Sequence, residues 1–286
     1  MYYSNINIFL PLYQNRTKEE LASIIEQSSS NPGLIYKYEK DFLLTLILIK
    51  FGEKYPNLIF KWGTCLNKTY FPYFRLSEDL DFVINQDLGR SARQTLLREY
   101  EESFVSDLRV LGLTLRAERT KYDEHRLAMF TFEYSSIFDS SLQTIKIDIS
   151  LKSSLIYWSK KLPIKSVYTD QFLEESIFSQ DHTISCIDLT ESMAEKMRAA
   201  LTRREPAIRD FFDIWYVRSF SDFDFERDEF RSLLRHKLAE VQYEYTLEIN
   251  YDLLRRQIET DLRPVLTDNY GFDFDTIYTF ILSYKI

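Results

Sequence analysis

The stretch from Phe60 to Ile84, FKWGTCLNKTYFPYFRLSEDLDFVI, constrains this chain more than any other. Its pattern predicts a strand, a tight turn at Gly63 and Thr64, a short helix, a loop, and a second strand that carries Asp79 and Asp81. Side chains alternate between the two faces of a strand, so we expect both carboxylates to project from one face. The apolar residues between and after them should point into the opposite, buried face.

Two carboxylates on one face of a rigid strand, near a turn whose backbone can approach a phosphate, suit a divalent metal that carries a nucleoside triphosphate. The pattern Asp-x-Asp also occurs at residues 222–224 and 273–275. There the surroundings predict helix N-termini, where acidic residues are favoured for electrostatic reasons alone. For either acid of the first pair, an ordinary salt bridge to Lys61 or Arg75 is the alternative.

The six glycines exclude several nucleotide-binding motifs. They form neither a dinucleotide-binding G-x-G-x-x-G nor a phosphate-binding G-x-x-x-x-G-K-[ST] motif. No G-x-S-x-G sequence of a serine hydrolase exists either. If the protein handles a nucleotide, Gly63 is therefore the one glycine placed for close approach of the backbone. Three widely separated histidines also argue against a zinc site.

Composition narrows the class of protein. A chain of 286 residues fits one large domain or two modest ones, and its net charge of −8 argues against a surface covered with nucleic acid. Cys65 and Cys186 form no disulfide framework, which indicates reduced thiols. The longest apolar run, residues 42–49, is too short to span a bilayer, and the N-terminus lacks the basic segment of a signal peptide. We therefore expect a cytoplasmic protein without membrane association.

Hydrophobic periodicity predicts a mixed α/β part followed by a helical part. Residues 34–51 predict a buried helix that ends at Gly52, and Ser91 begins a long helix that Gly112 closes. Strands are expected at 58–62, 80–84, 113–118, 126–134 and 142–151, which predicts a sheet of about five strands. In the last strand, Asp148 faces away from the flanking isoleucines. After Pro163 the pattern turns helical, with helices expected at 189–201, 207–220, 226–240, 247–262 and 273–284.

Four motifs in order resemble the AbiEii/AbiGii-type toxin nucleotidyltransferases, a branch of the DNA-polymerase-β-like nucleotidyltransferase superfamily. The first is the Trp62-Gly63-Thr64 turn followed by Asp79-Leu80-Asp81, and the second is IKIDIS with Asp148. The third is AEKMRAALTRR with Lys196, and the fourth is the segment RDFFD, which carries Arg209, Asp210 and Asp213. Together the motifs span about residues 58–218. Trp62 departs from the family, which has glycine there, and leaves open how the phosphates would be held.

The resemblance implies an α+β chain in which a mixed sheet of the nucleotidyltransferase fold is flanked by helices and followed by a C-terminal helical bundle. Residues 1–180, including the N-terminal helices, would form the nucleotidyltransferase domain. Residues 181–286 would form the helical bundle, which contributes Lys196 and the Arg209-Asp210 motif.

The resemblance also implies roles for individual residues. Asp79 and Asp81 would hold Mg²⁺ or Mn²⁺, and Asp148 would complete a second metal site or help to activate the acceptor hydroxyl. Gly63 and Thr64 would bind the phosphates, while Lys196 and Arg209 would bind the nucleotide. Asp210 would position or deprotonate the acceptor, with a structural Arg209–Asp210 pair as the alternative. The basic residues of this region would form a rim suited to RNA or simply a solvated helix face: Lys196, Arg198, Arg203, Arg204 and Arg209.

The implied function is transfer of a nucleotidyl group from an NTP to an acceptor, with release of pyrophosphate. The acceptor would be a tRNA or other RNA end, or a protein hydroxyl. The chain would act as a toxin of a toxin–antitoxin or phage-defence system, with an antitoxin protein as a possible partner. The alternative is a catalytically degenerate member of the fold that serves as a binding module, and Trp62 is the residue that favours it.

Overall fold

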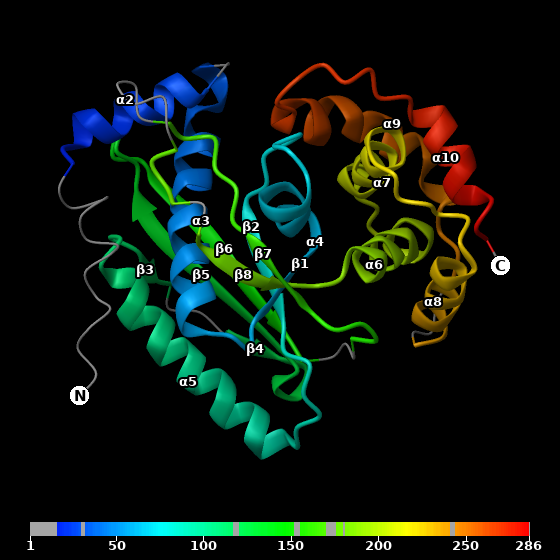
Figure 1. The fold of residues 1–286 in the computed structure, drawn as a ribbon, viewed down its shortest axis with the longest axis horizontal. Coiled ribbons are helices and arrows are strands. Elements are labelled where there is room, and N and C mark those ends of the chain that lie inside the picture. The colour runs from blue at the N-terminus through cyan, green and yellow to red at the C-terminus, as the bar shows by residue number, and fades with distance from the viewer. Residues whose placement is uncertain are drawn as a thin grey trace. The chain divides into compact units, whose positions relative to one another are not determined.

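The computed structural model describes residues 16–29, 32–116, 120–151, 155–169, 176–179, 181–240 and 244–285. Residues 1–15, where the sequence predicts no signal peptide, lie outside this range. The described chain forms two compact units (Figure 1). The first runs to Leu155 and resumes at Ser159–Cys186; the second consists of Ile156–Trp158 and the chain from Ile187 onward. That residues 1–180 and 181–286 are the folding domains stays a prediction.

The first unit is built on an eight-stranded mixed sheet with the order β3-β5-β6-β2-β1-β8-β7, and β4 pairs with β5. The central strand β2 pairs with β1 antiparallel and with β6 parallel. The strands are β1 (Ile59–Lys61), β2 (Asp79–Val83), β3 (Thr114–Leu115), β4 (Lys121–Tyr122), β5 (Leu127–Ser135), β6 (Leu142–Ser150), β7 (Lys160–Pro163) and β8 (Thr183–Cys186).

The predicted fold class, a mixed sheet flanked by helices and followed by a helical part, is confirmed. The expected strand count was too low. Strands β7 and β8 follow residue 151, beyond the last strand expected, and β8 lies after Pro163, where a helical pattern was expected; β4 is a two-residue strand. Strands of two to four residues are too short to show an alternating pattern, so their pairing depends on the sheet that they join.

Two long helices cover one face of this sheet (Figure 1). The phenyl ring of Phe51 in α3 (Ile35–Lys54) stacks on that of Phe104 in α5 (Arg90–Arg109), with 4.4 Å between ring centroids. Phe51 also contacts Phe82 of β2, and Phe104 contacts Phe130 of β5. The remaining helical segments of this unit are α2 (Lys18–Ser28), η1 (Pro32–Leu34), α4 (Trp62–Cys65), the π-helical η2 (Leu66–Tyr70) and η3 (Asp123–His125).

Gly52 lies inside α3, so the prediction that it ends this helix is wrong. A Cβ atom at Gly52 would lie only 2.1 Å from the carbonyl oxygen of Thr183 in β8. Glycine is therefore needed because the backbone of α3 contacts the backbone of β8. Similarly, α5 begins at Arg90 with Gly89 as its N-cap rather than at Ser91.

The second unit is helical. Its segments are α6 (Leu189–Thr202), α7 (Ile208–Phe220), α8 (Asp228–Ala239), η4 (Glu248–Asn250), α9 (Tyr251–Gln257), the π-helical η5 (Ile258–Leu262), η6 (Arg263–Val265) and α10 (Phe274–Leu282). Buried Glu191 of α6 pairs with buried Lys237 of α8, at 2.6 Å, and accepts hydrogen bonds from the main-chain N–H groups of Ile156 and Tyr157. These bonds explain why that short segment belongs to the helical unit. Among the described helices, none combines the length and the apolar character that crossing a membrane requires.

Replacing Gly52 by alanine should destabilise the protein, although alanine is the better helix former. The added methyl group would collide with a carbonyl oxygen that the β8 strand cannot easily move. We expect the free energy of unfolding to fall by about 1–3 kcal/mol in urea denaturation.

Gly89→Ala is the matched control, because no atom lies within 4 Å of the position of its Cβ. Its effect should be below about 1 kcal/mol. A Gly52→Ala variant as stable as the wild type would contradict the packing role assigned to this glycine.

Candidate active site

The acids of the second predicted strand share one face of the sheet with Asp148. In the parallel pairing of β2 with β6, Asp81 lies opposite Asp148 and Asp79 lies opposite Lys146. Residues that face each other in a ladder project to the same side, and residues two apart in a strand do so as well. The structure therefore brings Asp79, Asp81 and Asp148 together on one face. Leu80 lies on the other face and is fully buried.

The carboxyl group of Asp148 has a raised pKa. Burial and the negative charge of Asp79 raise its pKa to about 6, although the charges of Lys146 and Lys61 act in the opposite direction. Its Oδ1 atom is buried and accepts no hydrogen bond from the described residues. A buried carboxylate oxygen without a donor is costly, and a bound cation or proton removes that cost.

The turn that precedes this strand has an unusual backbone. Trp62 adopts φ +67°, a left-handed conformation that glycine adopts readily and that costs an L-residue about 1–2 kcal/mol. Gly63 does not have a positive φ. Trp62, at the position where the resemblance implies a glycine, thus adopts a conformation suited to glycine, at a cost in strain. Strain of this kind is commonly kept where a site requires it.

Thr64 connects the turn to the strand of the acids. Its side chain is buried, and its hydroxyl donates a hydrogen bond to the carbonyl oxygen of Asp79 at 2.6 Å. The hydroxyl oxygen of Ser77 lies 2.6 Å from the hydroxyl oxygen of Thr64. The Thr64 side chain is therefore engaged within the protein and fixes the position of Asp79 relative to Gly63.

The residues of the third and fourth motifs form a cluster within the helical unit. The Lys196 ammonium lies 2.9 Å from Asp210 Oδ1 and 2.6 Å from Asp213 Oδ2, and Arg203 lies 3.1 Å from Asp210 Oδ2. The two acids are three residues apart and share one face of α7, the spacing from which Asp213 could have been predicted as a member. Arg209 makes no ion pair with Asp210 in the described part of the chain, so the alternative of a structural Arg209–Asp210 pair is wrong.

The predicted basic rim is largely neutralised within its own unit. Lys196 and Arg203 bind the acids of α7, and Arg198 lies 2.8 Å from Glu195. Arg204 is exposed, and Arg209 is partly buried. Pairing with carboxylates reduces the positive charge that this helix face could offer to an RNA backbone.

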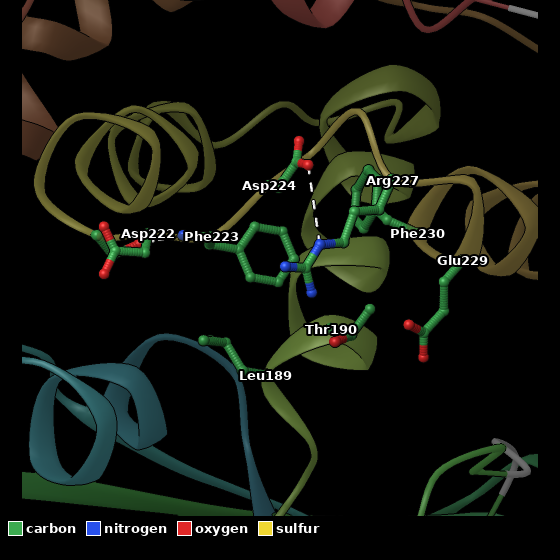
Figure 2. A pocket seen from close by; sticks show the side chains of 9 residues that line it. Leu189, Thr190, Asp222, Phe223, Asp224, Arg227, Glu229 and Phe230 are labelled. Carbon is green, nitrogen blue, oxygen red and sulfur yellow. Dashed lines mark hydrogen bonds and ion pairs between the residues drawn. The ribbon is translucent and has the colours of Figure 1, made fainter.

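A pocket of about 340 Å³ lies elsewhere in the helical unit, between the start of α6 and the loop that joins α7 to α8 (Figure 2). Asp224 and Arg227 form an ion pair of 3.8 Å beside it, and the carboxylate of Glu229 also lines it. None of the residues predicted for the site lines this pocket.

The acid face, which we define as the sheet face that carries Asp79, Asp81 and Asp148, is the candidate metal site. Within the residues that the structure describes, no group of three or more His, Cys, Asp or Glu side chains is arranged to hold a metal ion. Mg²⁺, however, is usually bound through one or two carboxylates together with water and substrate phosphates, and needs no cage made only of protein. The oxygen ligands and the unsatisfied Oδ1 of Asp148 fit a metal that arrives with its nucleotide.

A family model for the nucleotidyl transferase AbiEii toxin of type IV toxin–antitoxin systems matches residues 47–280. The chain belongs to this family. The predicted family is thereby confirmed, and the match extends beyond the motifs, which end near residue 218. This AbiEii-family chain is a toxin-type nucleotidyltransferase.

Solved structures share the fold of this AbiEii-family chain. MenT4, a nucleotidyltransferase toxin from Mycobacterium tuberculosis, has a TM-score of 0.64 at 16% identity, and the match covers 94% of this chain and 88% of that one. JHP933 from Helicobacter pylori has a TM-score of 0.51 at 15% identity, covering 87% and 90%. At such low identity the likeness shows the fold alone. No curated protein sequence matches the chain.

The ion pair of Lys196 should matter for the stability of the AbiEii-family protein. Lys196→Met would remove the ammonium group that lies 2.6 Å from the fully buried carboxylate of Asp213. The free energy of unfolding should then fall by about 3–5 kcal/mol. Arg198→Met is the matched control on the same helix, and losing its pair with Glu195 should cost below about 1 kcal/mol. If both variants lost the same free energy of unfolding, the ion pairs of Lys196 would contribute no more to stability than the pair of Arg198 with Glu195.

The raised pKa of Asp148 predicts a pH-dependent effect on stability. Because its pKa of about 6 in the folded protein lies above the ordinary value, the folded state favours the protonated form. The contribution of Asp148 to the free energy of unfolding is therefore largest at acidic pH, below the ordinary pKa of an aspartate. This contribution is lost as the pH rises through about 6. Asp148→Asn stays neutral and should therefore raise Tm by a few degrees at pH 8 in the presence of a chelator, with little change at pH 4.5.

The control for this measurement is Asp222→Asn, which changes an exposed acid outside the acid face. Its effect on Tm should be small at both pH values. If Asp148→Asn lowered Tm at pH 8, the carboxylate would be favourably paired in the folded protein, contrary to its raised pKa.

Proposed function

We propose that this protein is a metal-dependent nucleotidyltransferase that moves a nucleotidyl group from an NTP to an acceptor hydroxyl and releases pyrophosphate. The observation that carries the proposal is the shared face of Asp79, Asp81 and Asp148, together with the buried, unsatisfied oxygen of Asp148. Three acids brought together without any use would repel one another and cost stability. Bound cations would offset this repulsion, which explains why the three acids are kept together.

In this proposal, Asp79 and Asp81 hold Mg²⁺ or Mn²⁺. The ion, when bound, supplies positive charge to the phosphate oxygens of the nucleotide. Asp148 lies beside Asp81 and has a pKa of about 6, so near neutral pH it is ionised and can accept the proton of the acceptor hydroxyl. Gly63 exposes main-chain N–H to the phosphates, and Thr64 positions the strand of the acids through its bond to Asp79.

The third and fourth motifs carry further charged residues within the helical unit. Lys196 is held between Asp210 and Asp213, and this pairing fixes the direction of its ammonium group. We assign Lys196 and Arg209 to the nucleotide. The role of Asp210 is then to orient Lys196, rather than to deprotonate the acceptor, since its two oxygens already accept from Lys196 and Arg203.

Family membership supports a cytoplasmic toxin with a cognate antitoxin, since the family belongs to type IV toxin–antitoxin systems. The acceptor is the end of an RNA such as tRNA, or a hydroxyl of a protein, and labelling of total RNA and of lysate proteins separates the two. The competing function, a degenerate binding module, was suggested by Trp62. The left-handed backbone at Trp62 supports retention of the turn and therefore favours the enzyme.

The central test is transfer of label from each radiolabelled NTP, with Mg²⁺, to total RNA or lysate protein. Asp79→Ala and Asp81→Ala should each lower the rate by at least about a thousandfold, since both carboxylates are assigned to the metal. Asp222→Ala, from an exposed Asp-x-Asp outside the acid face, is the matched control and should keep the wild-type rate. Undiminished labelling by the Asp79→Ala/Asp81→Ala double variant would remove the acid face from the reaction.

A further inference from the structure

Lys61 is a nearly buried lysine on the acid face, and the proposed roles leave it unused. It is the last residue of β1 and lies opposite Asp81 in the antiparallel pairing with β2. Only 8% of its surface is exposed. Because paired residues project to one side, the Lys61 side chain lies on the same face as the three acids. Its charge is close enough to act on Asp148.

The ammonium group of Lys61 has a defined position. It lies 4.7 Å from the centroid of the Trp62 indole ring. Such a cation–π contact contributes about 0.5–2 kcal/mol and restricts a side chain that otherwise has four rotatable bonds. The contact keeps the ammonium at the end of β1, where the turn with Gly63 begins.

Trp62 makes this contact at a cost. Its φ of +67° is a conformation in which glycine would carry no strain. A bulky L-residue in this conformation needs a reason to persist. The contact between its indole ring and Lys61 supplies one, because glycine would relieve the strain but would release the ammonium group.

We propose that Lys61 binds the triphosphate of the incoming nucleotide and that Trp62 is a positioning residue that holds its ammonium group for this purpose. The inference rests on the proposed function. A triphosphate that approaches Asp79, Asp81 and Asp148 meets several like charges, and a resident ammonium group offsets part of this repulsion. Ammonium groups also donate up to three hydrogen bonds, which are strong when the acceptor is a phosphate oxygen. Lys61 therefore gives the phosphates a positive charge and hydrogen-bond donors, which the three acids lack.

The test uses the full chain and four variants: Lys61→Met, Lys61→Arg, Trp62→Gly and Trp62→Phe. Calorimetry measures the affinity for inorganic tripolyphosphate and for a non-hydrolysable NTP, each with and without Mg²⁺, and transfer assays give KM and kcat. Lys61→Met should weaken tripolyphosphate binding at least about tenfold, the factor expected from losing one charge-assisted hydrogen bond. Lys61→Arg keeps the charge and should recover part of this loss. Binding of RNA, measured separately, should change little, which distinguishes nucleotide phosphates from acceptor phosphates.

Trp62→Gly separates positioning from stability. Relief of the backbone strain should raise Tm, yet affinity for tripolyphosphate should fall and KM for the NTP should rise several-fold. Trp62→Phe keeps an aromatic face and should remain close to the wild type. A residue that matters only for folding would not give a more stable protein that binds phosphate more weakly. Should Lys61→Met fail to fold, Lys61→Arg and the two Trp62 variants carry the test.

Unchanged tripolyphosphate affinity in the Lys61 variants would overturn the inference, as would a loss confined to RNA binding. Unchanged affinity in Trp62→Gly would remove the positioning role. If the wild-type protein transfers label and Asp79→Ala abolishes transfer in the same experiments, these failures leave the proposed function intact. A wild-type protein that neither binds nor transfers an NTP would instead overturn the proposed function itself.

Discussion

The parallel pairing of β2 with β6 is the constraint on which the candidate site depends. Its register places Asp81 beside Asp148, and a slip of one residue would turn the side chain of Asp148 to the opposite face. Burial of that opposite face determines the register. Phe82 and Ile149 face each other there, both fully buried, beneath α3 and α5. The aromatic core thus positions the acids, although none of its side chains touches a nucleotide in the proposed function.

Buried ion pairs fix the positions of the segments next to the turn and of the helices in the helical unit. Lys68, on the π-helical segment that follows the turn, lies 2.8 Å from Asp41 of α3, and both side chains are buried. Thr64 of the turn is bonded to Asp79 of β2, and Lys68 after the turn is paired with α3. The turn is therefore held both by the sheet and by a helix. In the helical unit, Lys196 and Lys237 are paired with buried acids. Buried pairs of this kind add little net stability, but breaking one is costly, so they favour a single arrangement of the helices.

Much of this arrangement could be predicted from the sequence because it follows from alternation within single strands. The patterns of residues 79–83 and 142–150 determine which side chains share a face, and the spacing of Asp210 and Asp213 determines a helix face. Contacts between distant segments could not be predicted in this way. Gly52 was predicted to end a helix because glycine is common at helix ends. Its actual partner, Thr183, is about 130 residues away in the sequence, so the sequence near Gly52 gives no sign of the contact. The same limit applies to the short strands β7 and β8, and to the pairing of Asp210 with Lys196 instead of Arg209.

Trp62 shows how a departure from a family motif can be evaluated in physical terms. From the sequence alone, tryptophan in place of glycine left open how the phosphates are held and favoured a degenerate binding module, because tryptophan adopts the left-handed backbone only at a cost in energy. The structure retains that backbone and places the strain on Trp62. The strain costs about 1–2 kcal/mol, and strand β1 ends at the preceding residue, so the pairing of β1 does not explain why this backbone persists. Retention of the strained turn next to the acids and Lys61 therefore argues for a working site rather than a degenerate one.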